Sequence, residues 1–253
     1  MDLRKSKYIL PNLFTLASVF FGLFAIASVM EGGGSTGVRR AAIAILVALI
    51  ADGLDGRVAR MTRSETKFGV QLDSLADVIS FGVAPGILGY SFALSHMEVS
   101  WVGLLIAFIY VACGAMRLAR FNVMTERRSK PTPWFTGLPI PAAAGIVATL
   151  AWGMSDLGVS ERSRIIPFMV TMIAMGLLMV SNVRYRNFKQ INAGLGTKIA
   201  LMLLASSLII AMIKIKASYT LLAFGAVYIF LGPTEWLIGL LRRQLRVQMK
   251  DEE

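Results

Sequence analysis

Long runs of apolar residues, separated by short polar stretches, follow one another along almost the whole chain. A helix needs about 20 mainly apolar residues to cross the hydrocarbon core of a bilayer. The runs that approach this length cover residues 8–30, 40–61, 69–94, 100–121, 136–154, 165–183, 198–214 and 218–241. We therefore predict an all-α fold, a polytopic membrane bundle of about eight transmembrane helices.

The segments between these runs are too short to bury a core of their own. We expect one transmembrane domain over residues 1–241, which must also carry whatever chemistry the protein performs, and a charged tail over residues 242–253. The composition agrees with this prediction. Hydrophobic residues make up 56% of the chain and charged residues 16%, a balance that is too apolar for an ordinary soluble domain.

Lysine and arginine are unevenly divided between the two ends of the predicted helices. Of the 26 in the chain, 20 fall on the side that holds both termini. Because cytosolic loops carry the excess of positive charge, we expect an even number of spans and both termini in the cytosol. We expect the protein in the cell (inner) membrane. The net charge of +11 then indicates contact with anionic lipid headgroups and no nucleic acid partner.

The chain has one cysteine and one histidine. Cys113 lies within a predicted helix, so a disulfide within the monomer and a cysteine metal site are both excluded. His96 lies in a short loop between two predicted helices, and we interpret it as a surface residue rather than a metal ligand.

Two neighbouring predicted helices, 40–61 and 69–94, break the apolar pattern. The first is polar in its second half, the second is polar in its first half, and a short basic loop joins the two polar ends. The spacing within each helix places its two aspartates on one face. An antiparallel pair therefore gathers four carboxylates at the cytosolic side of the membrane, those of Asp52, Asp55, Asp73 and Asp77.

Four ionised carboxylates in a low-dielectric setting repel one another unless cations lie between them. Oxygen ligands favour Mg²⁺ or Mn²⁺, and this many acids could hold two such ions. Glycines among the acids leave room for a large group near the helix backbone, and Arg60 could meet an anion. The pattern indicates a phosphate or pyrophosphate site; interhelical salt bridges with close helix packing are the structural alternative.

The spacing from Asp52 to Asp77 is D-x2-D-G-x2-A-R-x8-G-x3-D-x3-D. It resembles the full signature of the CDP-alcohol phosphotransferase family, with none of the eight fixed positions altered. The resemblance implies that all four aspartates ligate the metal ions and that Asp77 also acts as general base on the acceptor hydroxyl. It implies that the CDP-lipid site includes Gly56, Ala59, Arg60 and Gly69, with Arg60 near the phosphates.

Further segments narrow the resemblance within that family. They are similar to segments of the integral-membrane phosphatidylserine synthases, and read LPNLFTLASVFFG, QLDSLADVISFGVAPG, CGAMRLARFNV, FTGLPIPAAA and SNVRYRNFK. By this resemblance Asn12 and Thr15 help to hold the nucleotide or its phosphates. Arg117 and Arg120 would recognise an anionic group, with Arg120 and Asn122 near the serine carboxylate. Snorkelling to headgroups is the alternative for the two arginines.

The implied reaction transfers the phosphatidyl group from CDP-diacylglycerol to the hydroxyl of L-serine, giving phosphatidylserine and CMP. Within the same family, the acceptor could instead be glycerol 3-phosphate or inositol phosphate, or the donor an archaeal ether lipid. A cation-coupled transporter also places acids in a membrane, but here the acids cluster at one end and no internal repeat is evident. In a purely structural scaffold protein, the four acidic residues would have no function. We further expect a homodimer.

Overall fold

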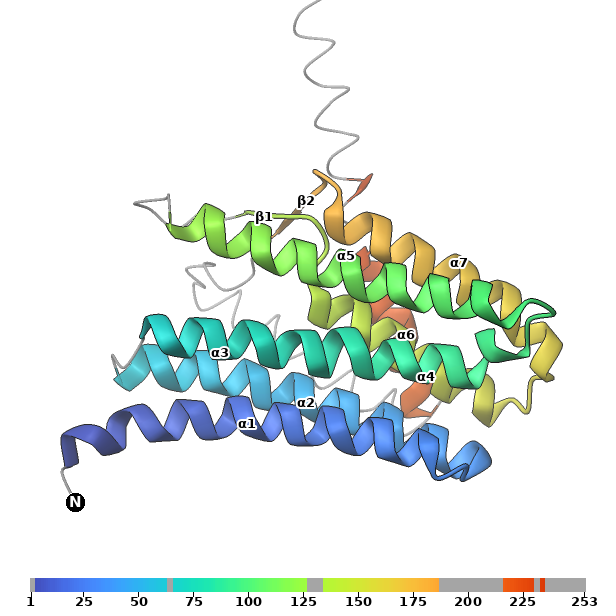
Figure 1. Ribbon diagram of the computed structural model, residues 1–253, viewed down its shortest axis with the longest axis horizontal. Helices are drawn as coiled ribbons and strands as arrows, with labels where there is room; N and C mark the ends of the chain where they lie inside the picture. Colours follow the sequence, from blue (N-terminus) through green and yellow to red (C-terminus); the bar gives the residue numbers. More distant parts are fainter. Residues whose placement is uncertain (1–2, 63–65, 127–133, 187–215, 230–232, 235–253) are drawn as a thin grey trace, which may run out of the picture.

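The predicted apolar segments fold as long helices (Figure 1). The computed structural model describes residues 3–62, 66–126, 134–186, 216–229 and 233–234. The labelled helices are α1 (Leu3–Met30), α2 (Gly34–Thr62), α3 (Lys67–Asp77), the π-helix η1 (Val78–Val83), α4 (Ala84–Phe92), the 3₁₀ helix η2 (Leu94–His96), α5 (Ser100–Glu126), α6 (Ile140–Asp156) and α7 (Glu161–Val180). The first six predicted segments are thus helical, with α3, η1 and α4 forming one continuous rod over the third.

The last two predicted segments are described only in part. Segment 198–214 and the tail 242–253 lie outside the described residues, and the eighth segment is described as a shorter apolar helix over Ala217–Ile229. The division into a domain over 1–241 and a tail therefore stays a prediction.

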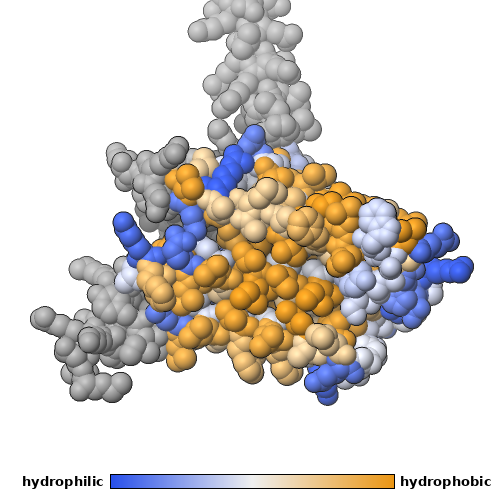
Figure 2. Space-filling view, in the orientation of Figure 1, coloured by the Kyte–Doolittle hydropathy of each residue, from blue (hydrophilic) through white to orange (hydrophobic). Residues whose placement is uncertain are grey.

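Four helical segments in the described part of the chain are long and apolar enough to cross a membrane. They are Asn12–Met30, Lys67–His96, Ser100–Met124 and Glu161–Val180. Large apolar side chains such as Leu13, Leu16 and Phe20 of α1 remain exposed, and their helical spacing gives a face suited to lipid. Figure 2 shows hydrophobic side chains across the middle of the molecule and hydrophilic ones toward both ends. The helical membrane bundle is confirmed, while the count of eight spans stays a prediction.

The two ends of the bundle differ in what they hold. At one end α2 finishes, α3 begins and α5 and α7 finish (Figure 1). We name this the acidic end, because the aspartates of α2 and α3 lie there. The connections from α1 to α2, from α4 to α5 and from α6 to α7 gather at the opposite end.

Small side chains allow the central helices to pack closely. Helix α6 contacts α2, α4 and α7. On α2, Ala41, Ile45 and Ala48 are fully buried, and on α6 Ala144 and Ala148 are fully buried. Lipid is as apolar as a leucine side chain, so helix association in a membrane depends on such close packing rather than on a hydrophobic driving force. This packing fixes α2, which carries two of the aspartates.

Two short strands add a feature that the sequence did not predict. Strand β1 (Trp134–Thr136) pairs antiparallel with β2 (Arg184–Arg186), with Phe135 opposite Tyr185. Gly137 follows β1 in the left-handed region at φ +80°, a conformation that favours glycine. The next residue, Leu138, donates its backbone N–H to Leu178 O at 3.0 Å. This turn fixes the start of α6 against the end of α7, beside the acidic end.

Candidate metal and phosphate site

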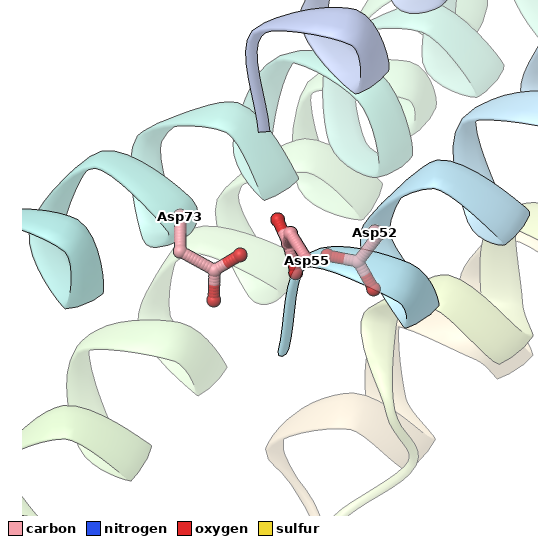
Figure 3. Close-up of side chains that lie close together, drawn as sticks. All are labelled: Asp52, Asp55 and Asp73. Atoms are coloured by element: carbon pink, nitrogen blue, oxygen red, sulfur yellow. The ribbon is translucent and has the colours of Figure 1, made fainter. Parts of the chain in front are cut away.

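Three of the four predicted metal ligands converge at the acidic end. Asp52 and Asp55 come from α2, and Asp73 comes from α3. Each offers one carboxylate oxygen, and these oxygens all lie within 4.8 Å of one another. Figure 3 shows the carboxyl groups of the three residues gathered between the two helices. The antiparallel course of α2 and α3 thus brings together three of the four aspartates that the spacing predicted to converge.

Helix α1 also contacts this cluster. The Thr15 hydroxyl donates a 2.8 Å hydrogen bond to Oδ2 of Asp55, and both residues are buried. A hydrogen bond to an ionised carboxylate is stronger than one between neutral groups, and a buried one orients its acceptor. Thr15 was predicted to help hold the nucleotide or its phosphates; its observed contact is with one of the predicted metal ligands.

Asp77 lies outside the group of three but next to it. It is the last residue of α3 and only 9% exposed. Its carboxyl group is within side-chain hydrogen-bonding reach of Asp52 and has the charges of Asp73 and Arg117 nearby. Oδ1 of Asp77 is buried and has no hydrogen-bond partner among the described residues. That oxygen is therefore available to accept a proton or to bind a cation.

The backbone changes from α-helix to π-helix directly after Asp77. The π-helix η1 extends over Val78–Val83, and short π segments inside α-helices are frequent at functional sites. Neighbouring helices hold it from two sides. The Tyr110 hydroxyl of α5 donates to Phe81 O at 3.1 Å, and the Ser80 hydroxyl donates to Ser18 O of α1 at 2.9 Å. These bonds fix the segment that carries Asp77, and nothing in the sequence pattern indicated them.

Among the described residues, Arg117 is an arginine that lies near the acidic residues. It is 8% exposed, it lies within electrostatic range of the Asp77 carboxyl group and of the Tyr228 phenol, and its guanidinium carbon lies 6.0 Å from the centre of the Phe121 ring. Nε of Arg117 is buried without a hydrogen-bond partner among the described residues. A buried guanidinium with an unpaired donor is suited to an anionic ligand.

The other two predicted acceptor residues make defined contacts. Arg120 is exposed and donates from Nη2 to Oδ1 of Asn182 at 2.7 Å, with Nη1 3.4 Å from Val180 O. Asn122 donates from Nδ2 to the Ser74 hydroxyl at 2.8 Å, which ties α5 to α3 one residue after Asp73. Arg120 therefore contacts the end of α7, and Asn122 contacts the helix that carries two of the acids.

Two of the predicted nucleotide residues, Asn12 and Gly69, lie at the start of α3. Thr66 caps this helix, its hydroxyl accepting from Gly69 N at 2.9 Å. A Cβ on Gly69 would lie 3.8 Å from Oδ1 of Asn12 and 3.2 Å from Oγ1 of Thr66, so Asn12 and Gly69 are close neighbours. Gly56 is half-buried on α2. The side chains of Ala59 and Arg60 lie outside the described part of the chain, although both residues belong to the last turns of α2.

For Tyr185, the sequence allows an interfacial anchor or a part of the entrance for the polar substrate, and of the two it favours the anchor. Its side chain is 1% exposed, and its hydroxyl has no hydrogen-bond partner among the described residues. The Tyr185 ring centre lies 5.9 Å from that of Tyr228, which in turn interacts with Arg117. A tyrosine two residues past a predicted span does not by itself indicate a site, because such residues often serve as interfacial anchors.

The donor set fits divalent cations. Ionised carboxylates that lie this close together repel one another, and the buried Oδ1 of Asp77, which has no hydrogen-bond partner among the described residues, adds to the unfavourable free energy. Oxygen-only ligands are those that Mg²⁺ and Mn²⁺ prefer. The residues that could hold such an ion are Asp52, Asp55 and Asp73, with Asp77 adjacent to them.

The fold and this site together define a multi-pass helical membrane protein with a carboxylate cluster at one end of the bundle. Its sequence matches the model of the CDP-alcohol phosphatidyltransferase family over residues 8–177, and the chain belongs to that family. This finding confirms the resemblance that the aspartate spacing indicated.

The chain is also similar to named relatives. It is 36% identical over 230 residues to the CDP-diacylglycerol–serine O-phosphatidyltransferase of Helicobacter pylori, covering 91% of this chain and 92% of the relative. The enzyme with the same name from Bacillus subtilis is 32% identical over 72% of this chain and 92% of its own length. An archaetidylserine synthase of Methanothermobacter thermautotrophicus is 38% identical over 70% of this chain and 69% of its own length.

Proposed function

We propose that this protein transfers the phosphatidyl group from CDP-diacylglycerol to the hydroxyl of L-serine, giving phosphatidylserine and CMP. The observation that carries the proposal is the convergence of Asp52, Asp55 and Asp73, with Asp77 beside them, at one end of an apolar bundle. The names of the relatives in Helicobacter and Bacillus support serine as the acceptor.

The aspartates would hold Mg²⁺ or Mn²⁺, and we propose two ions. When bound, such ions would neutralise the pyrophosphate of the donor and stabilise CMP as it leaves. Thr15 would keep the Asp55 carboxylate in one orientation through its hydrogen bond. Asn12, Gly56, Ala59, Arg60 and Gly69 would accommodate the CDP moiety around the start of α3 and the end of α2, with Arg60 near the phosphates.

Asp77 would act as the general base. The serine oxygen would form a bond to the phosphatidyl phosphorus while the bond from phosphorus to the CMP oxygen breaks. The hydroxyl proton would pass to Asp77, whose Oδ1 has no partner among the described residues. Transfer in one in-line step requires no covalent enzyme intermediate, and the neighbouring π-helix would fix the carboxylate that receives the proton.

The acceptor would lie between Asp77 and α5. Among the described residues, Arg117 is the best-placed cation for the serine carboxylate, because it is buried beside Asp77 and its Nε has no hydrogen-bond partner among them. Asn122 would approach from the same helix, through the side that contacts Ser74. For Arg120, the bonds to Asn182 and Val180 favour a role in shaping the pocket wall next to the carboxylate.

The acidic end would face the cytosol of the inner membrane, because serine, CMP and the excess of lysine and arginine belong on that side. Both termini would then be cytosolic. A cleft open to lipid and to water at this end would let the acyl chains remain in the bilayer during transfer. We propose a homodimer as the functional unit.

The test is CMP release by the purified full-length protein with CDP-diacylglycerol and Mn²⁺, comparing L-serine with glycerol 3-phosphate and inositol phosphate. Release that depends on serine alone is expected, and D77N is the negative control. Release of CMP with another acceptor but not with serine would refute serine as the acceptor, while the phosphatidyl transfer typical of the family would still hold. A parallel reaction with an ether-linked CDP-lipid addresses the alternative donor suggested by the archaetidylserine synthase relative.

A further inference from the structure

A second polar site lies at the end of the bundle opposite to the aspartates. There a cavity of about 540 Å³ is lined by residues from the ends of α1, α4 and α6 and from the starts of α2 and α7. Figure 1 shows these helix ends gathered at one end of the bundle. Its lining includes Arg164, Glu161 and His96, and it shares no residue with the acidic cluster. What this cavity binds is a question independent of the proposed transferase reaction.

Arg164 presents a fixed guanidinium to the cavity. Its Nε donates a 2.7 Å hydrogen bond to Val159 O, and its guanidinium carbon lies 4.2 Å from the centre of the Phe92 ring, which also lines the cavity. Arg164 forms no ion pair with any described residue, and its two terminal nitrogens make no hydrogen bond there. The stacking and the Nε bond hold the plane of the group, so the two terminal nitrogens are preorganised for a bidentate anion.

Serine hydroxyls supply further donors around the same cavity. Four of them line it, and none makes a side-chain hydrogen bond within the described part of the chain: Ser28, Ser35, Ser91 and Ser155. The one carboxylate in the lining, that of Glu161, lies 3.5 Å from Nε2 of His96. Arg164 therefore has no ion-pair partner among the described residues, and hydroxyl donors lie within the same cavity.

The position of the cavity indicates which anion it meets. The ends of apolar membrane helices lie at the level of the lipid headgroups, where phosphate groups are abundant. Phe92 and Val29 add apolar surface to the lining, which suits a group that is part phosphate and part glycerol ester. Ligand pockets usually have volumes of about 300–1,000 Å³, so the cavity is large enough for a phospholipid headgroup.

We propose that this cavity binds a phosphate group through the terminal nitrogens of Arg164 and the surrounding serine hydroxyls. The source is either the headgroup of an anionic phospholipid or a free phosphate ion. Both present the same tetrahedral oxygens to the arginine fork, so the experiment has to distinguish them.

The experiment titrates the purified full-length protein, in an uncharged detergent, with dihexanoyl phosphatidylglycerol or with inorganic phosphate by calorimetry. Dihexanoylglycerol, which lacks the phosphate, is the ligand control. We expect saturable binding that weakens by about tenfold or more in R164Q, because a charge-assisted contact is lost. R162Q is the matched variant: Arg162 is exposed on the same helix and does not line the cavity, so binding should be unchanged.

Each outcome has a defined meaning. Binding of the phosphatidylglycerol alone assigns the cavity to a lipid headgroup, and binding of inorganic phosphate with the same dependence on Arg164 assigns it to the free ion. Equal binding of dihexanoylglycerol, unchanged binding in R164Q, or no saturable binding of either phosphate probe would overturn the proposal. If R164Q has a lowered melting temperature, the same titration is repeated with S91L. Ser91 lines the cavity from an exposed position on α4, so a larger leucine side chain should fill the cavity and weaken binding equally. Unchanged binding in S91L would then overturn the proposal.

Discussion

The Thr15 hydroxyl donates a 2.8 Å hydrogen bond to Oδ2 of Asp55, joining the first helix of the bundle to the carboxylate cluster. Both residues are buried, so the bond is protected from water. Asp55 is thereby oriented from a helix that supplies none of the clustered carboxylates. The cluster depends on three helices, although the signature motif covers only two.

This bond predicts the effect of T15V. The substitution keeps the shape of the side chain but removes the donor, and groups that orient metal ligands typically affect metal affinity by about 10–100-fold. We expect the Mn²⁺ concentration for half-maximal CMP release to rise by about tenfold or more. T15S, which retains the hydroxyl, should stay close to the parent protein. An unchanged Mn²⁺ dependence in T15V would show that the bond does not orient the ligand.

Asp77 and Asp52 should differ in what their replacement removes. We expect D77N to abolish CMP release while binding of CDP-diacylglycerol is largely kept, because the proton acceptor alone is lost. D52N should instead weaken metal dependence and nucleotide binding, since Asp52 belongs to the group of three converging carboxylates. Single-turnover CMP release and Mn²⁺ titration of nucleotide binding separate the two. Turnover retained in D77N would exclude Asp77 as the base.

The bond from Tyr110 to Phe81 O gives a prediction about the π-helix. Y110F leaves a carbonyl in η1 without its partner, which should lower the free energy of unfolding by about 1–3 kcal/mol. Because η1 follows Asp77 directly, we also expect kcat to fall by more than a smaller fraction of folded protein would explain. Thermal unfolding and steady-state CMP release, both measured at a temperature where the variant is fully folded, check this. A fall in stability without any change in kcat would show that the segment serves the fold alone.

Arg117 and Arg120 can be compared by their effects on the two substrates. R117K keeps the charge beside Asp77 but loses the planar fork, and a lost bidentate contact should raise KM for serine by about tenfold. KM for CDP-diacylglycerol should change little. R120K is the comparison, since Arg120 bonds to Asn182 rather than to the acidic residues. If R117K changes both KM values equally, Arg117 does not act through the acceptor.

The sequence predicted much of the carboxylate cluster because helical periodicity decides which aspartates share a face. The position of Asp77 outside the group of three was not predictable in this way. Asp77 directly precedes a π-helix, and hydrogen bonds of Tyr110 and Ser80 join that π-helix to separate helices. Periodicity describes one helix at a time, so contacts between distant helices escape it.

The same limit applies to the arginines of α5. The resemblance implied that both Arg117 and Arg120 recognise an anionic group, and residues three apart lie near each other on a helix surface. In the structure Arg117 faces Asp77, while Arg120 bonds to the chain after α7.

The pairing of β1 with β2 was not predictable for two reasons. The strands are separated in the sequence by two helices, and each strand has only three residues, too few for an alternation of polar and apolar residues to be recognised.

Tyr185 provides a prediction about alkaline pH. Burial raises the pKa of its phenol to about 12, with the nearby Tyr228 adding to the effect, whereas an unfolded tyrosine has a pKa of about 10. Between these values the unfolded chain has lost the proton while the folded protein keeps it, so stability falls as pH rises through this window. Below about pH 10 the phenol is neutral in both states and contributes no pH dependence.

We therefore expect Y185F to reduce the loss of melting temperature between pH 9 and pH 12, when compared with the parent protein in the same detergent. At pH 7 the two proteins should unfold at nearly the same temperature, because the hydroxyl has no hydrogen-bond partner among the described residues and its removal leaves no described group unpaired. Groups that titrate in both proteins cancel in the comparison. A large drop in melting temperature at pH 7, or an alkaline slope identical to that of the parent, would show that the phenol is not buried as the structure places it.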